Sequence, residues 1–152
     1  MKLELKHLAP YLPYGLKISN DNISTKSKDI LLKALTKEKE HHYYATLVCN
    51  GDLKCCNSCN SETEKTREIY AQIWTIKPIL RPLSDLLKNE FENVYKNQID
   101  YESIEHLSEL DCESFLTCNF SYEFWQSLFK NHFDVFGLIE KGLAIDINTI
   151  KK

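Results

Sequence analysis

Lys77-Pro78-Ile79-Leu80-Arg81-Pro82 divides the 152-residue chain into two halves of different character. Proline fixes φ and lacks a backbone N–H, so we expect Pro78 and Pro82 to end a sheet region. Pro82 is also well placed to open a helix, because the first helical turn has no partner for that N–H. The stretch therefore predicts strands on its N-terminal side and helices on its C-terminal side.

Several segments before this stretch have the composition of strands. Residues 69–76 are the strongest candidate, since they are rich in β-branched and aromatic residues. Residues 43–49 are a second strand, and they lead into Asn50-Gly51, a dipeptide typical of a two-residue hairpin turn with residues 53–56 as the return strand. Residues 29–36 fit either a short helix or the first arm of a hairpin with residues 43–49, because periodicity does not assign a short apolar run.

Helical spacing dominates the chain after this stretch. Apolar residues recur at three- and four-residue intervals over residues 83–95 and predict an amphipathic helix of three to four turns. A second, shorter helix is expected over residues 101–110. A third begins near Ser121, a good N-cap, and is expected to bury Phe124, Trp125, Leu128, Phe129 and Phe133. Residues 143–147 form a short extended end.

Strands followed by helices indicate the α+β class. We predict a single domain over residues 1–152, strand-rich over residues 1–80 and helical over residues 81–152. In this arrangement a small antiparallel sheet from the N-terminal half packs against about three helices from the C-terminal half. The length is sufficient to bury a core without disulfides or metal.

The composition is typical of globular proteins, with 43% hydrophobic and 27% charged residues. The charged residues are unevenly distributed along the chain. Residues 1–88 carry 14 basic and 10 acidic side chains, a balance of +4, whereas residues 89–152 carry 5 and 12, a balance of −7. The net charge of −3 argues against a protein that coats nucleic-acid phosphates. The acidic C-terminal half is either a solvated surface or a surface for a basic partner.

The N-terminal residues alternate apolar with charged side chains, so they lack the apolar core of a secretory signal. No stretch has the length of apolar residues that a membrane span requires. We therefore expect a cytoplasmic protein without a membrane partner. Its six cysteines are then expected to be reduced thiols.

Three blocks of sequence carry a resemblance to a known group of proteins. They are residues 8–17 (LAPYLPYGLK), 77–86 (KPILRPLSDL) and 132–148 (HFDVFGLIEKGLAIDIN). In these blocks the chain resembles small uncharacterised proteins encoded by phages and prophages of anaerobic gut bacteria. The resemblance implies a phage origin and favours a strand over residues 29–36, but the group has no established catalytic or binding residues to transfer.

The blocks contain four polar residues that are candidates for a site: Arg81, Asp85, His132 and Asp134. Arg81 and Asp85 are four residues apart, so they are expected to form an ion pair across one helical turn. The prolines, glycines and large apolar residues of the same blocks have the simpler interpretation that they define the backbone and the core.

A cysteine cluster is the only candidate metal site. Cys49, Cys55, Cys56 and Cys59 lie close together, and Cys56-Asn57-Ser58-Cys59 is a C-x-x-C motif. Such a motif supplies two adjacent vertices of a tetrahedral zinc site. The second pair of thiolates is either Cys49 with Cys55, which a hairpin at Asn50-Gly51 could bring together, or Cys112 with Cys118. The competing interpretation is four ordinary reduced thiols without a cofactor.

The usual motifs of enzymes and nucleotide-binding proteins are missing from the sequence. It contains no G-x-S-x-G, no H-E-x-x-H and no glycine-rich phosphate loop. Lysines at positions 26, 28, 33, 37 and 39 precede Tyr43 and Tyr44, a pattern that can serve single-stranded nucleic acid, although acidic residues interrupt it.

These observations predict a non-enzymatic accessory or structural protein that acts by contact with a phage or host protein, or by self-association. The alternative is a small zinc-binding or nucleic-acid-interacting module that uses the cysteine cluster. The aromatic content of 11% is compatible with an interface as well as with a core.

Overall fold

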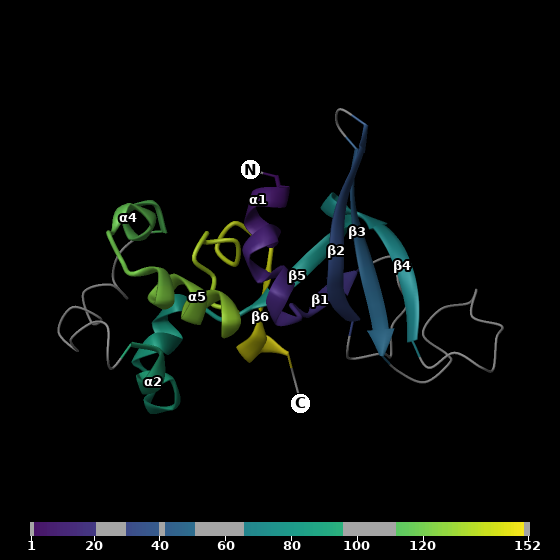
Figure 1. The fold of residues 1–152 in the computed structure, drawn as a ribbon. Coiled ribbons are helices and arrows are strands. Elements are labelled where there is room, and N and C mark those ends of the chain that lie inside the picture. Colours follow the sequence, from purple (N-terminus) through teal and green to yellow (C-terminus); the bar gives the residue numbers. More distant parts are fainter. Residues whose placement is uncertain (1, 21–29, 40–41, 51–65, 96–111, 151–152) are drawn as a thin grey trace. The chain divides into compact units, whose positions relative to one another are not determined.

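The computed structural model describes residues 2–20, 30–39, 42–50, 66–95 and 112–150. The chain forms two compact units, Met1–Ile79 and Leu80–Lys152. The boundary lies inside the stretch bracketed by Pro78 and Pro82. Strands dominate the first unit and helices the second, which confirms the α+β class (Figure 1). That residues 1–152 behave as one domain stays a prediction.

Unit 1 contains an antiparallel sheet in the order β2-β3-β4. Its strands are β2 (Ile30–Lys39), β3 (His42–Asn50) and β4 (Thr66–Gln72). The first two strands pair from Ile30 with Cys49 to Lys39 with His42. Of the two interpretations of residues 29–36, the hairpin arm is therefore the one that the structure adopts.

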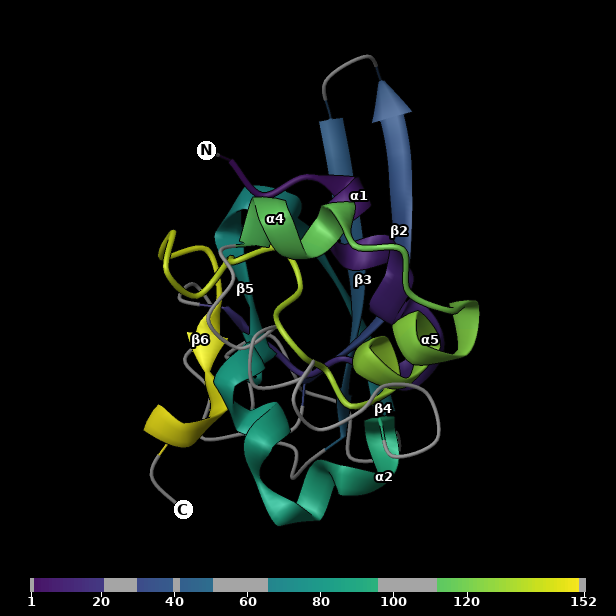
Figure 2. The same cartoon turned by 90° about the vertical axis from the view of Figure 1, so that its left-hand side faces the viewer.

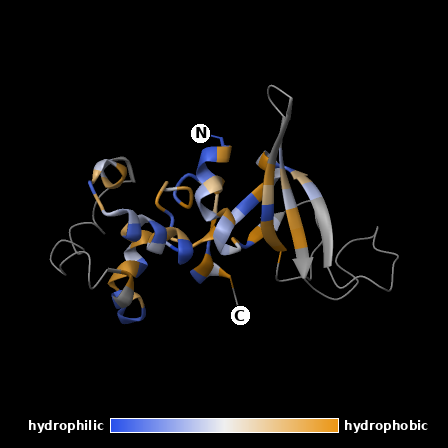
Figure 3. Ribbon diagram, in the orientation of Figure 1, coloured by the Kyte–Doolittle hydropathy of each residue, from blue (hydrophilic) through white to orange (hydrophobic). Residues whose placement is uncertain are grey.

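Alternation along the strands gives this sheet one apolar face, and Thr46 on the opposite face is buried as well. Ala45 and Leu47 of β3 are fully buried, and in register they pair with Ala71 and Ile69 of β4. Leu32 pairs with Leu47 from the other side and is also buried. Residues two apart in a strand point to the same face, so the side chains of Leu32, Ala45, Leu47 and Ala71 form one apolar layer. Hydrophobic residues recur along β2 and β3 (Figure 3).

The prediction of a two-residue hairpin turn at Asn50-Gly51 is wrong. Asn50 pairs with Thr66, so β3 is followed in the sheet by β4, and residues 51–65 connect the two strands. A return strand over residues 53–56 would need a free edge of β3. Both edges of that strand are already occupied, one by β2 and the other by β4.

The strand expected over residues 69–76 is divided in two. β4 ends at Gln72, a short 3₁₀ turn covers Ile73–Thr75, and β5 runs over Ile76–Leu80. β5 pairs antiparallel with β1 (Ile18–Asn20). The backbone changes direction because buried Ile73 and Ile76 flank the exposed Trp74, a spacing that one straight strand would not give.

Pro78 does not end the sheet region, contrary to the sequence expectation, because it pairs with Ile18 inside β5. The N–H of the next residue, Ile79, donates to the carbonyl of Lys17 over 2.9 Å. Since successive N–H groups of a strand point in opposite directions, the nitrogen of Pro78 faces away from β1. A missing donor therefore costs nothing in this pair.

The N-terminal segment of unit 1 is helical. α1 (Leu5–Leu8) leads into a 3₁₀ helix, η1 (Ala9–Tyr14), and Gly15 ends it with a φ of 64°. At the start of α1, the buried His7 accepts a hydrogen bond on Nδ1 from the backbone N–H of Glu4 over 3.1 Å. This histidine is a capping residue in the structure.

Unit 2 begins with a broken helical segment instead of the continuous helix expected over residues 83–95. The pieces are η3 (Leu83–Leu87), η4 (Asn89–Phe91) and α2 (Glu92–Tyr95). Lys88, between the first two, has an extended backbone with ψ of 137°. The apolar spacing is satisfied all the same, since Leu86, Phe91 and Val94 are all buried.

The helix predicted to begin at Ser121 is confirmed. α5 covers Tyr122–Lys130, and the Ser121 hydroxyl accepts from the N–H of Phe124 over 3.2 Å. α4 (Cys112–Thr117) precedes it and was not expected from the sequence. The helix predicted over residues 101–110 lies outside the described residues. Figure 2 shows α2, α4 and α5 from a second direction.

The end of α5 fixes the start of the C-terminal segment. His132 has a φ of 59°, and its N–H donates to Phe129 while the N–H of Phe133 donates to Leu128. These two bonds define a Schellman motif, in which the accompanying apolar contact joins Phe133 and Leu128. Both side chains are fully buried. The chain then ends with β6 (Ile145–Asp146) and a 3₁₀ turn, η5 (Ile147–Thr149).

None of the helices in the described residues combines the length and the apolar character needed to cross a membrane.

Candidate functional site

The second and third of the resembling blocks meet in unit 2. Arg81 donates its backbone N–H to His132 over 2.9 Å, and its carbonyl accepts from the N–H of Asp134 over 2.7 Å. These bonds form a parallel bridge between Arg81 and Phe133. All four polar candidates from the sequence therefore belong to, or lie next to, a single backbone junction.

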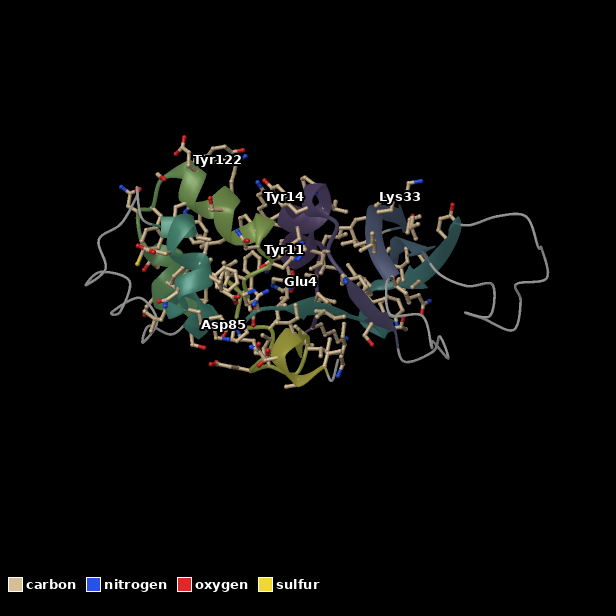
Figure 4. The ribbon with its side chains drawn as sticks, turned by 90° about the horizontal axis from the view of Figure 1, so that it is seen from below. Glu4, Tyr11, Tyr14, Lys33, Asp85 and Tyr122 are labelled. Atoms are coloured by element: carbon tan, nitrogen blue, oxygen red, sulfur yellow. The ribbon has the colours of Figure 1, made fainter. Side chains whose placement is uncertain are left out.

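The ion pair expected between Arg81 and Asp85 is present, with Nη1 3.5 Å from Oδ2. Asp85 has two further partners: Lys88 Nζ lies 2.8 Å from Oδ1, and Asn148 donates from Nδ2 to Oδ2 over 3.1 Å. The Asp85 side chain is only 6% exposed, so its charge needs these partners (Figure 4). Burial favours a higher pKa for Asp85, but the bonds from Lys88 and Asn148 and the nearby cations outweigh it and hold the pKa below its ordinary value.

Arg81 also lies over the ring of Phe91, with Cζ 4.4 Å from the ring centroid. Its Nη1 is 3.8 Å from the exposed carboxylate of Glu90. Nε is buried and has no hydrogen-bond partner among the described residues. With two carboxylates and an aromatic face around it, the guanidinium is a cross-link within unit 2, and its charge is already compensated.

Acid is expected to destabilise unit 2 through Asp85. Because its folded pKa lies below the ordinary value of 3.8, its contribution is present above that pH and is lost as the pH falls through the folded pKa. Asp85→Asn should therefore lower the free energy of unfolding by about 1–3 kcal/mol at neutral pH, and the difference from wild type should shrink below about pH 4. Urea unfolding, followed by Trp125 fluorescence in a Trp74→Phe background, measures both values. If Asp85→Asn lowers the free energy of unfolding by the same amount at every pH, the lowered pKa of Asp85 does not contribute to stability as we infer.

Asp134 is the second buried carboxylate of this junction. Oδ1 accepts from the N–H of Leu138 over 2.9 Å and Oδ2 from the N–H of Ile139 over 2.7 Å. Burial raises the pKa of Asp134 above its ordinary value, although the backbone donors and the charge of Lys141 oppose the rise. The side chain closes the turn that follows Asp134, so its chemistry here is that of a cap.

Half-buried aromatic side chains form a row along α5 and the residues on either side of it, where Trp125 and Phe129 were expected to be buried. The rings contact one another in succession: Phe120 to Trp125 at 5.7 Å between centroids, Trp125 to Phe129 at 6.2 Å, and Phe129 to Phe136 at 6.4 Å. All four pack against the buried core and keep part of their surface in solvent. We call these four residues the aromatic row.

Further exposed apolar side chains lie on α4 and on α5, the helix that carries Trp125 and Phe129 of the aromatic row. Leu116 of α4 is 43% exposed and Tyr122 of α5 is 71% exposed (Figure 4). Helical periodicity predicted Phe124, Trp125, Leu128, Phe129 and Phe133 as buried, and Phe124, Leu128 and Phe133 are fully buried. For Trp125 and Phe129 the prediction is wrong, because both are only half-buried, and periodicity alone does not separate the edge of an apolar helix face from its centre.

Of the four cysteines of the predicted metal site, only Cys49 is among the described residues. Cys49 lies in β3, where its backbone pairs with Ile30 and Arg67, and Cys55, Cys56 and Cys59 lie outside the described residues. Within the described part of the chain, no three potential metal ligands come together. The zinc interpretation therefore stays a prediction.

The basic segment considered for nucleic acid is only partly described. Lys33 is exposed on β2 (Figure 4), and Tyr44 is half-buried on β3. Lys37 and Lys39 are in β2, where their backbones pair with Tyr43 and His42. Lys26 and Lys28 lie outside the described residues, so this interpretation also stays a prediction.

Comparisons with known proteins provide no relative from which a function could be transferred. Neither a protein-family model, nor a curated protein, nor a solved structure matches this chain.

Proposed function

We propose that the chain is a non-enzymatic accessory or structural protein of phage origin that acts in the bacterial cytoplasm by protein–protein contact. The observation that supports this proposal is the aromatic row of unit 2. Aromatic side chains are enriched at protein interfaces, and tryptophan in particular is often a residue on which binding depends. Trp125 lies inside the row, in contact with Phe120 and Phe129.

The polar candidates favour a structural over a catalytic role, which is the second argument for this proposal. Arg81 and Asp85 bind each other, and Asp134 binds backbone N–H groups of its own turn. A general acid or base needs a proton-transfer partner in the substrate, whereas the carboxylates of Asp85 and Asp134 accept hydrogen bonds from groups of unit 2. Enzymatic activity would have to come from other residues.

Charge suggests the chemistry of the partner. Residues 89–152 have a balance of −7, and Glu90, Glu92 and Glu123 are exposed among the described residues. Complementary charge around an apolar contact steers association and selects the partner. We therefore propose a phage or host protein with an apolar pocket and a basic rim.

Replacing Trp125 with alanine is expected to raise the Kd for the captured partner at least about 30-fold, which is the loss of affinity typical of an interface hot spot. The measurement is affinity capture with the tagged chain from phage-infected host cells, followed by titration of the purified partner. Added salt should also slow association, because the rim contacts are electrostatic.

The matched control is Trp74→Ala, which removes the chain's other tryptophan, a 53% exposed residue of unit 1. It should leave capture unchanged. Thermal unfolding of both variants must show that unit 2 is folded, since Trp125 also contacts the buried Phe115. If Trp125→Ala is folded and binds as wild type does, or if no protein is captured above background, the proposal is wrong.

A further inference from the structure

We draw no further inference here: the strongest candidate, the face of the β2-β3-β4 sheet on which the exposed Tyr70 of β4 lies beside the buried Thr46 of β3, carries no proposal because nothing in the structure shows what covers that face.

Discussion

Asp134→Ala is expected to lower the free energy of unfolding of unit 2 by about 2–4 kcal/mol. The Asp134 carboxylate accepts from the N–H groups of Leu138 and Ile139, at 2.9 and 2.7 Å. Without it, two donors in a largely buried turn lose their acceptor, and each costs about 1–3 kcal/mol. Urea unfolding followed by Trp125 fluorescence in the Trp74→Phe background measures the change.

Asp146→Ala provides a matched control for this loss. Asp146 also accepts a backbone N–H on its side chain, from Asn148 over 2.8 Å, but at an exposed site. Water can replace that acceptor, so the variant should lose at most about 1 kcal/mol. Equal effects of the two substitutions would show that burial of the Asp134 cap does not contribute as we infer.

The pH dependence at Asp134 should have the opposite sign to that at Asp85. Because the folded pKa of Asp134 is above its ordinary value of 3.8, its ionisation disfavours the folded state as the pH rises through that folded pKa. The free energy of unfolding of wild type, relative to that of Asp134→Asn, should therefore increase as the pH is lowered. Relative to that of Asp85→Asn, it should decrease.

Local signals in the sequence predicted the elements that local interactions determine. Ser121 marked the start of α5 because its hydroxyl satisfies a helical N–H by itself. The four-residue spacing of Arg81 and Asp85 likewise predicted their ion pair, although no complete helical turn joins them, because Pro82 is extended and η3 begins at Leu83. Such signals depend on a few adjacent residues and are readable without the fold.

Elements set by contacts distant in sequence were not predictable in the same way. The position of Pro78 in a strand depends on which side of it β1 lies, and the partner of β3 at Asn50 is Thr66, not the residues after the turn. The extended backbone of Lys88 divides an apolar pattern that is periodic throughout. Periodicity records which side chains are buried and leaves the path between them open.

The same distinction applies to the candidate sites. The sequence identified Asp134 as a polar residue of interest, but its role as a cap depends on the turn that brings Leu138 and Ile139 to it. The aromatic row combines residues from α5 with Phe120 and Phe136 on either side of it. In sequence those residues are indistinguishable from the core residue Phe133, which is fully buried.

Phe133→Ala is expected to have the largest effect of any substitution considered, about 3–5 kcal/mol in the free energy of unfolding of unit 2. The Phe133 side chain is fully buried, and its ring meets Phe91 edge to face with centroids 5.1 Å apart. Its backbone joins the Schellman motif of α5 to the bridge with Arg81. Truncation therefore leaves a cavity at the point where three segments of unit 2 meet.

Phe136→Ala is the comparison that separates this role from simple loss of aromatic area. Phe136 is half-buried in the aromatic row, so truncation opens its site to solvent and leaves no closed cavity. We expect a loss of about 1–2 kcal/mol for this variant, with Phe133→Leu falling between the two. If Phe136→Ala destabilises as much as Phe133→Ala, the aromatic row belongs to the core of unit 2. The row would then not be available to bind a partner, and the function proposed from it would be wrong.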